Sequence, residues 1–183
     1  ATRIAGRWKN NDGFTAQSGT VTFDGGDQTI AGSTTFYNFT KTESADDATD
    51  ETLTFTAGTT QTITGTWTLD GRDSDDQINI VSSSPGTAWN VSPSGTRTLD
   101  FITITDSANT SGTTILCSND CTNGGGNSGW AFPITVTVYT DEGSTTIGSG
   151  KTVAVAVDGG SKATAETNGS GVASFTTVAV SSG

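Results

Sequence analysis

Apolar residues alternate with threonine, serine, glycine and aspartate through residues 18–40, SGTVTFDGGDQTIAGSTTFYNFT. A period of two is typical of a β-strand with one buried face, and the glycine-containing turn DGGD interrupts the alternation. A related pattern returns in residues 52–69 and 96–105. This recurrence predicts a repeated β unit, in which each stretch of about 20 to 25 residues adds one coil to a parallel β-helix.

Threonine and serine dominate the composition, with 38 Thr and 20 Ser in 183 residues. β-Branched threonine suits the outward positions of a strand, and the 24 glycines interrupt every window that would otherwise form a long helix. We therefore expect an all-β chain. The expected strands are 3–8, 19–23, 28–31, 34–41, 52–57, 60–69, 77–82, 88–91 and 98–105, followed by 134–140, 151–157, 162–166 and 173–180.

The pattern changes after residue 132. Residues 134–140 and 151–157 alternate strictly, and the turn TNGSG between residues 162–166 and 173–180 predicts a hairpin. We expect two domains, a β-helix (solenoid) over residues 1–132 and a small antiparallel β-sandwich over residues 133–183. An immunoglobulin-like sandwich has about seven strands in about 100 residues, so the second domain is too short to be complete.

Two explanations of the short second domain compete. The chain is a piece of a longer repeat protein, or a neighbouring copy donates a strand that completes the fold. The candidate donor is the segment ahead of the first regular coil, which comprises Arg3, Ile4, Ala5, Gly6, Arg7 and Trp8. The same segment is equally suited to cap its own coil.

The formal net charge is −11, from eight Lys and Arg against 19 Asp and Glu. Nucleic-acid binding needs clustered basic side chains, so we expect no nucleic-acid partner. No apolar run is long enough to cross a membrane, so we expect no membrane span. The chain has no Met, even at position 1, which fits a processed protein or a piece of a longer one. We expect an extracellular, cell-surface location.

Cys117 and Cys121 lie in the loop LCSNDCTNGGG. In an exported protein such a pair is suited to a disulfide that closes a small ring. A reduced pair and half of a metal site are the alternatives.

Acidic residues gather in two predicted loops, ESADDATDE at 43–51 and DGRDSDD at 70–76. Calcium takes six to eight hard oxygen ligands, which loops of this kind supply. The candidate ligands are Asp70, Asp73, Asp75 and Asp76. Neither loop has EF-hand spacing, so a solvated loop of mutually repelling carboxylates is the main interpretation, calcium is the alternative, and no other cofactor is expected.

Catalysis is not expected from this chain. It has no His, which excludes Ser-His-Asp, Cys-His and zinc-protease arrangements. A polysaccharide-active enzyme on a β-helix would need paired carboxylates, but turn chemistry explains the 70–76 loop more simply. The four tryptophans would stack on surface glycans if they shared an exposed face, and otherwise they belong to the core: Trp8, Trp67, Trp89 and Trp130.

Four Asn-X-Ser/Thr sequons are candidate glycosylation sites: Asn38, Asn90, Asn109 and Asn168. Asn109 lies in the predicted loop DSANTSG and is the first choice among them.

Residues 6–40, GRWKNNDGFTAQSGTVTFDGGDQTIAGSTTFYNFT, and residues 97–130, RTLDFITITDSANTSGTTILCSNDCTNGGGNSGW, resemble the strand-and-turn repeats of bacterial and archaeal surface proteins that form right-handed parallel β-helices. Residues 136–178, VTVYTDEGSTTIGSGKTVAVAVDGGSKATAETNGSGVASFTTV, resemble the immunoglobulin-like or transthyretin-like modules that follow such repeats. The resemblance implies a segment of an exported adhesin-like, surface-layer or filament-forming protein.

These observations together predict a non-catalytic structural protein, a subunit or repeat segment of a cell-surface filament, surface layer or adhesin. Its expected partners are further copies of itself in a homopolymer, or neighbouring repeats of the same protein. A carbohydrate-binding adhesin module that recognises surface glycans is the second hypothesis, and a β-helical polysaccharide-active enzyme is the third.

Overall fold

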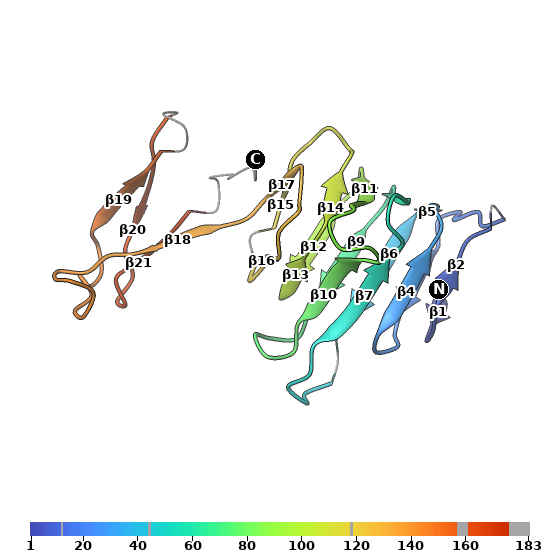
Figure 1. The fold of residues 1–183 in the computed structure, drawn as a ribbon, viewed down its shortest axis with the longest axis horizontal. Coiled ribbons are helices and arrows are strands. Elements are labelled where there is room, and N and C mark those ends of the chain that lie inside the picture. Colours follow the sequence, from blue (N-terminus) through green and yellow to red (C-terminus); the bar gives the residue numbers. More distant parts are fainter. Residues whose placement is uncertain (12, 44, 118, 157–160, 176–183) are drawn as a thin grey trace. The chain divides into compact units, whose positions relative to one another are not determined.

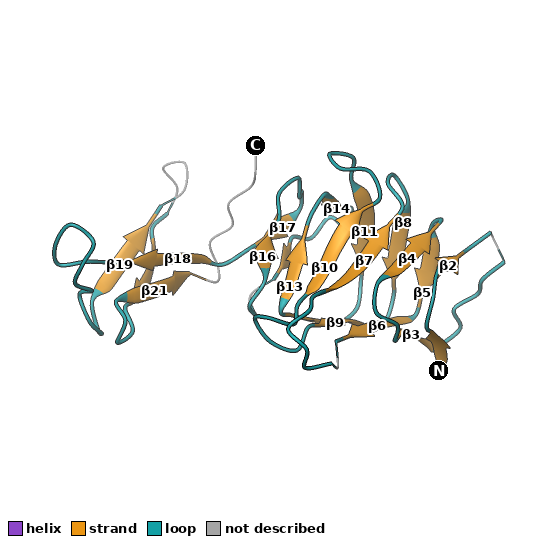
Figure 2. Ribbon diagram, turned by 60° about the horizontal axis from the view of Figure 1, so that its bottom comes forward, coloured by secondary structure: helices purple, strands orange, loops and turns teal. Residues whose placement is uncertain are grey.

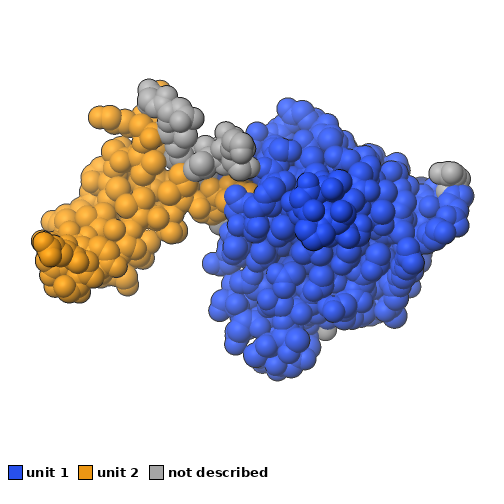
Figure 3. Space-filling model, in the orientation of Figure 1, with its two compact units in different colours: residues 1–130, 181–183 blue, residues 131–180 orange. Residues whose placement is uncertain are grey.

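The computed structural model describes residues 1–175 apart from 12, 44, 118 and 157–160, and every regular element in this part is a β-strand (Figures 1 and 2). The predicted all-β class is confirmed. The chain divides into two compact units, one covering residues 1–130 and one beginning at Ala131 (Figure 3).

Three parallel sheets, named A, B and C here, build the first unit. Within each sheet the strands pair in the order in which they occur in the sequence. Sheet A contains β1 (Thr2–Ile4), β3 (Thr20–Phe23), β6 (Asn38–Thr42), β9 (Trp67–Asp70) and β12 (Arg97–Asp100). Sheet B contains β2 (Trp8–Lys9), β4 (Gln28–Ala31), β7 (Glu51–Phe55), β10 (Ile78–Ser82), β13 (Ile102–Ile104) and β16 (Thr122–Asn123). Sheet C contains β5 (Thr34–Phe36), β8 (Thr60–Ile63), β11 (Trp89–Pro93) and β14 (Ser107–Asn109).

The chain visits the three sheets in a fixed rotation. From β3 to β14, each coil adds one strand to sheet A, then one to sheet B, then one to sheet C. The remaining strands of this region, β15 (Ile115–Leu116) and β17 (Trp130–Ala131), form a two-stranded sheet. Each coil is therefore hydrogen-bonded to the coil before it and to the coil after it.

Inward side chains stack from coil to coil. In sheet A, Phe23 registers with Lys41, and Lys41 registers with Leu69. Aromatic rings add specific contacts to this stack, with the Phe23 and Phe39 centroids 4.8 Å apart and the Phe55 and Trp89 centroids 4.1 Å apart. Burial of these apolar surfaces is the main stabilising contribution, and the stacked rings contribute beyond their area.

Four predicted strands are wrong in extent, because each is two strands joined at a corner. Residues 3–8 divide into β1 and β2, residues 34–41 into β5 and β6, residues 60–69 into β8 and β9, and residues 98–105 into β12 and β13. Inward side chains on both sides of a corner face the same core, so the period of two continues past the corner and hides it.

Local backbone geometry makes the corners. Phe101, between β12 and β13, has a φ of 44°, which turns the chain sharply. Between sheets C and A, Gly65 lies so close to the preceding coil that an added Cβ would be 2.9 Å from the carbonyl oxygen of Tyr37. The expected coil length of about 20 to 25 residues is not kept throughout the first unit, because the loops at the corners differ in length from coil to coil.

The second unit contains two antiparallel pairs. β18 (Ile134–Thr137) pairs with β21 (Val172–Phe175), and β19 (Thr152–Val155) pairs with β20 (Ala163–Glu166). The predicted hairpin across TNGSG is wrong, because β20 and β21 have different partners. Asn168 accepts hydrogen bonds from the Ser170 and Val172 amides there, so the turn redirects the chain from one pair to the other. The ends of the expected strands at 157 and 176–180 lie outside the described residues.

Candidate functional site

Acidic side chains gather where the chain passes from sheet A to sheet B. Corners of this kind follow β1, β3, β6, β9 and β12, and because their strands pair in sequence, the corners stack along one edge. The acidic side chains lie at the last four of them. We call this edge the acidic corner. It holds most of the chain's 19 acidic residues: Asp24, Asp27, Glu43, Asp46, Asp47, Asp50, Glu51, Asp70, Asp73, Asp75, Asp76 and Asp100.

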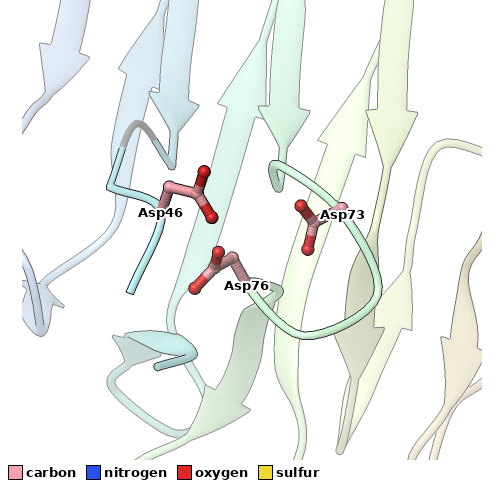
Figure 4. Close-up of side chains that lie close together, drawn as sticks. All are labelled: Asp46, Asp73 and Asp76. Atoms are coloured by element: carbon pink, nitrogen blue, oxygen red, sulfur yellow. The ribbon is translucent and has the colours of Figure 1, made fainter. Parts of the chain in front are cut away.

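Three carboxylates of the acidic corner converge from two loops (Figure 4). One carboxylate oxygen each of Asp46, Asp73 and Asp76 lie within 4.8 Å of one another. Asp46 comes from the loop between β6 and β7, and the other two come from the loop between β9 and β10. The sequence suggested Asp73 and Asp76 as ligands but missed Asp46, because only the stacking of the coils brings the two loops together.

Arg72 compensates much of this charge. It donates to Asp46 Oδ2 at 2.9 Å, and its Nε lies 3.8 Å from Asp73 Oδ2. Asp76 is buried, and its Oδ1 accepts a hydrogen bond from the Thr49 amide at 2.9 Å. A cation at this cluster would compete with Arg72 for Asp46, so the oxygens suit a divalent ion in chemistry but already have protein partners.

The other two predicted ligands play different parts. A hydrogen bond with Asp75 lowers the pKa of Asp73, and the same contact raises the pKa of Asp75. Asp70 lies at the end of β9 in register with Asp100. Burial and the Asp70 charge raise the pKa of Asp100.

A lysine occupies a core position beside the acidic corner. The Lys41 side chain is fully buried between Phe23 and Leu69 in the inward stack of sheet A. Its Nζ contacts Glu51 Oε2 and donates to the carbonyl oxygens of Gly25 and Gly26. The sequence pattern did not single out Lys41 as a site residue, although the alternation of residues 34–41 places it on the same face as Phe39. A buried ammonium of this kind is stable only when it is paired.

A buried carboxyl, Glu43, and a half-buried one, Glu51, complete the cluster around Lys41. Glu43 is 8% exposed, and its Oε1 accepts a hydrogen bond from the Ala45 amide at 2.7 Å. Burial raises the pKa of Glu51, Lys41 opposes that rise, and a hydrogen bond with Glu43 adds to it. The two glutamates line a groove of about 270 Å³ at the protein surface. The cluster therefore brings together the amine of Lys41, the carboxyl group of Glu51 and the carboxyl group of Glu43, which is hydrogen-bonded to Glu51.

Cys117 and Cys121 form a disulfide in the region between β15 and β16. Cys117 is buried. This segment follows the last coil of sheet A closely, because Asn119 forms a parallel bridge with Asp100 and Cys121 Sγ lies 3.8 Å from the carbonyl oxygen of Leu99.

The tryptophans pack inside the first unit. Trp67, Trp89 and Trp130 are at most 5% exposed. Trp8 packs edge-on against Phe14, with ring centroids 4.9 Å apart. These four rings therefore do not form an exposed surface for stacking on sugars.

The sequons differ in how their amide groups are used. Asn38 donates to Thr20 Oγ1, and Asn90 lies in β11. Asn109 is not in a loop as expected but in β14, where its Nδ2 donates to the carbonyl oxygens of Thr113 and Gly129. Asn168 is exposed in its turn.

The candidate donor segment belongs to its own coil in this structure. β1 pairs in parallel with β3, and β2 pairs in parallel with β4. Arg3 Nε donates to Asp24 Oδ2 at 2.5 Å, which fixes the segment to the first acidic turn.

No protein-family model, curated protein or solved structure matches this chain. A search of the described residues finds no helix with the length and hydropathy needed to cross a membrane.

Proposed function

We propose that this chain is a non-catalytic structural segment of an extracellular, cell-surface protein. In this proposal residues 1–132 form a parallel β-helix, and residues 133–183 form an immunoglobulin-like sandwich that is incomplete by itself. The observation that supports it best is the fixed rotation of the chain through three parallel sheets. Such a rotation joins every coil to its neighbours by backbone hydrogen bonds, which makes a stiff rod.

In the first unit, interior side chains serve packing and exterior side chains serve solubility and contact with partners. Apolar and aromatic side chains fill the interior, so their surfaces are used for packing. On the outside of sheet A, Thr22, Thr40, Thr68 and Thr98 stand in register from coil to coil. This threonine row and the acidic corner supply solubility and a polar contact surface without exposing apolar area.

Assembly with further copies or neighbouring repeats fits the second unit. Within the described residues, β18 pairs only with β21, and β19 pairs only with β20. A strand edge that lacks a partner is a template for strand addition. Neighbouring sequence or a second copy would complete the sheets, and the filament, surface-layer and adhesin hypotheses all use that property.

Immunogold electron microscopy of native cells tests the proposal, with an antibody raised against residues 1–130. We expect gold along extracellular filaments or a surface layer with a subunit-sized repeat, and none on cells that lack the gene. Label confined to the cell interior would contradict the proposal.

The carbohydrate-binding alternative predicts that tryptophan fluorescence changes when glycans of an array are added, whereas the buried tryptophans predict no change.

A further inference from the structure

Lys41 differs from every other basic residue of the chain. The other Lys and Arg side chains belong to exposed residues, whereas the Lys41 side chain is fully buried in sheet A. Its neighbours in register, Phe23 and Leu69, are apolar. A lysine at this position is costly for stability alone, because an apolar residue of similar size would fill the same place without a buried charge.

The amine of Lys41 is held against one carboxyl group. Nζ has three donors, and they are directed at Glu51 Oε2 and at the carbonyl oxygens of Gly25 and Gly26. The two backbone acceptors are fixed in the turn between β3 and β4. The amine nitrogen is therefore oriented towards Glu51 before any reaction takes place.

Glu43 supplies a second carboxyl group. It is buried, and it hydrogen-bonds Glu51. That bond and the burial of Glu51 raise the Glu51 pKa, which favours the neutral acid. A neutral carboxylic acid is the form that an amine attacks, because its hydroxyl can leave as water.

We propose that Lys41 and Glu51 form an intramolecular isopeptide bond, with Glu43 as the group that carries the protons. The inference does not depend on the proposed function, because it rests on the contacts of the buried Lys41 and Glu43 with the half-buried Glu51.

The reaction balances without an added reactant. The Lys41 ammonium passes a proton to Glu51, which it contacts, while the proton that Glu51 already holds moves across its hydrogen bond to Glu43. The freed lone pair of Lys41 then attacks Cδ of the protonated Glu51, forming the N–C bond. Glu43 then returns its proton to the Glu51 hydroxyl, the C–O bond breaks, and water leaves. The nitrogen passes its surplus proton to Glu43, which releases it to solvent through the groove of about 270 Å³. The products are one amide and one water, and nothing is oxidised or reduced.

The bond would close the loop between β6 and β7 covalently. This loop carries Asp46, a member of the carboxylate cluster, and it connects sheet A to sheet B. A covalent link there would prevent the two sheets from separating at this corner under load or at high temperature.

Intact-mass spectrometry of the purified full chain tests the proposal directly. We expect a mass lower than that of the sequence by one water molecule, in addition to the two hydrogens lost at the Cys117–Cys121 disulfide. Tryptic digestion after denaturation should leave residues 10–72 as one internally linked peptide. The full sequence mass, with cleavage after Lys41, would overturn the proposal and leave an ordinary buried ion pair.

Variants test the role of Lys41 as the attacking amine and the role of Glu43 as the proton carrier. Lys41→Arg keeps the charge but removes the amine, so the mass loss should disappear. Glu43→Gln should slow the mass loss at least about tenfold, because general acid–base groups typically contribute more than that. Glu142→Gln, an exposed site in the second unit, should keep the full loss. Crosslinking of Glu43→Gln at the wild-type rate would overturn the role of Glu43, and the wild-type mass decides the bond itself if a variant fails to fold.

Discussion

Replacing Gly95 by alanine tests the stacking of the coils. Gly95 lies at the corner between β11 and β12, against Gly65 at the same corner one coil earlier. A Cβ atom on residue 95 would lie 1.8 Å from the carbonyl oxygen of Gly65 and 2.6 Å from its carbonyl carbon. Both are backbone atoms, so no side-chain rotation relieves the clash and the two coils must move apart.

Whether Gly95→Ala raises or lowers the free energy of unfolding shows whether Gly95 packs against the neighbouring coil or lies in open space. Gly95 is not among the residues with positive φ, so in open space alanine would stabilise the protein by about 0.4–1 kcal/mol through the entropy of the unfolded chain. Overpacking against a rigid neighbour costs about 1–3 kcal/mol. A clash this close belongs at the upper end of that range, about 3 kcal/mol. The entropy gain of up to about 1 kcal/mol offsets part of this cost. We therefore expect the free energy of unfolding to fall by about 2 kcal/mol, which lowers the melting temperature by about 4–8 °C.

Urea unfolding followed by tryptophan fluorescence and circular dichroism measures this difference. Gly6→Ala is the matched control, because an added Cβ there meets nothing within 4 Å and the backbone has no positive φ. The control should be as stable as the parent chain or slightly more stable. A Gly95→Ala protein that is as stable as the control would refute the register that places Gly95 against Gly65.

Three further predictions concern charge, crosslinking and modification. Asp100→Asn should raise stability at pH 7 by about 0.2–1 kcal/mol, because Asp70 stands opposite it in register. The raised Asp100 pKa means that the folded state binds the proton more tightly, so stability is lost as the pH rises through that pKa, and the gain should vanish in urea titrations below pH 3.8. Reducing the Cys117–Cys121 disulfide should lower the free energy of unfolding by about 2 kcal/mol for so short a ring, and an unchanged urea midpoint with reductant would argue against this. In a glycosylating host, glycopeptide mapping should find glycan on exposed Asn168, and occupancy at the other sequons with Asn168 bare would contradict the structure.

Local pattern was sufficient to predict the all-β class and the short strands. Residues 28–31, expected as a strand, are β4, and residues 77–82 differ from β10 by one residue. The long strands were wrong because the period of two reports which face is buried but not when the chain changes sheet. The corner at Phe101 depends on a positive φ at a bulky residue, and nothing in its local sequence signals that geometry.

Only part of the candidate site could be predicted, because local sequence does not show which loops the stacking of the coils brings together. Asp73 and Asp76 belong to one obvious acidic loop, but their neighbour Asp46 lies in another loop, and unequal coil lengths concealed the match. Lys41 was visible as a charged residue at an inward position of its strand. Its partner Glu51 follows an intervening loop, so only the closing of that loop shows the pair.

The amino-acid sequence by itself determined the secondary structure and the balance of surfaces, because threonine-rich alternation with frequent glycine leaves the backbone no stable alternative to short strands. It also determined the negative charge. The tertiary structure decided which strands share a sheet, where the corners fall and which charges meet, because these depend on the register between coils. That register buries Lys41 beside Glu51 and stacks the acidic turns along one edge.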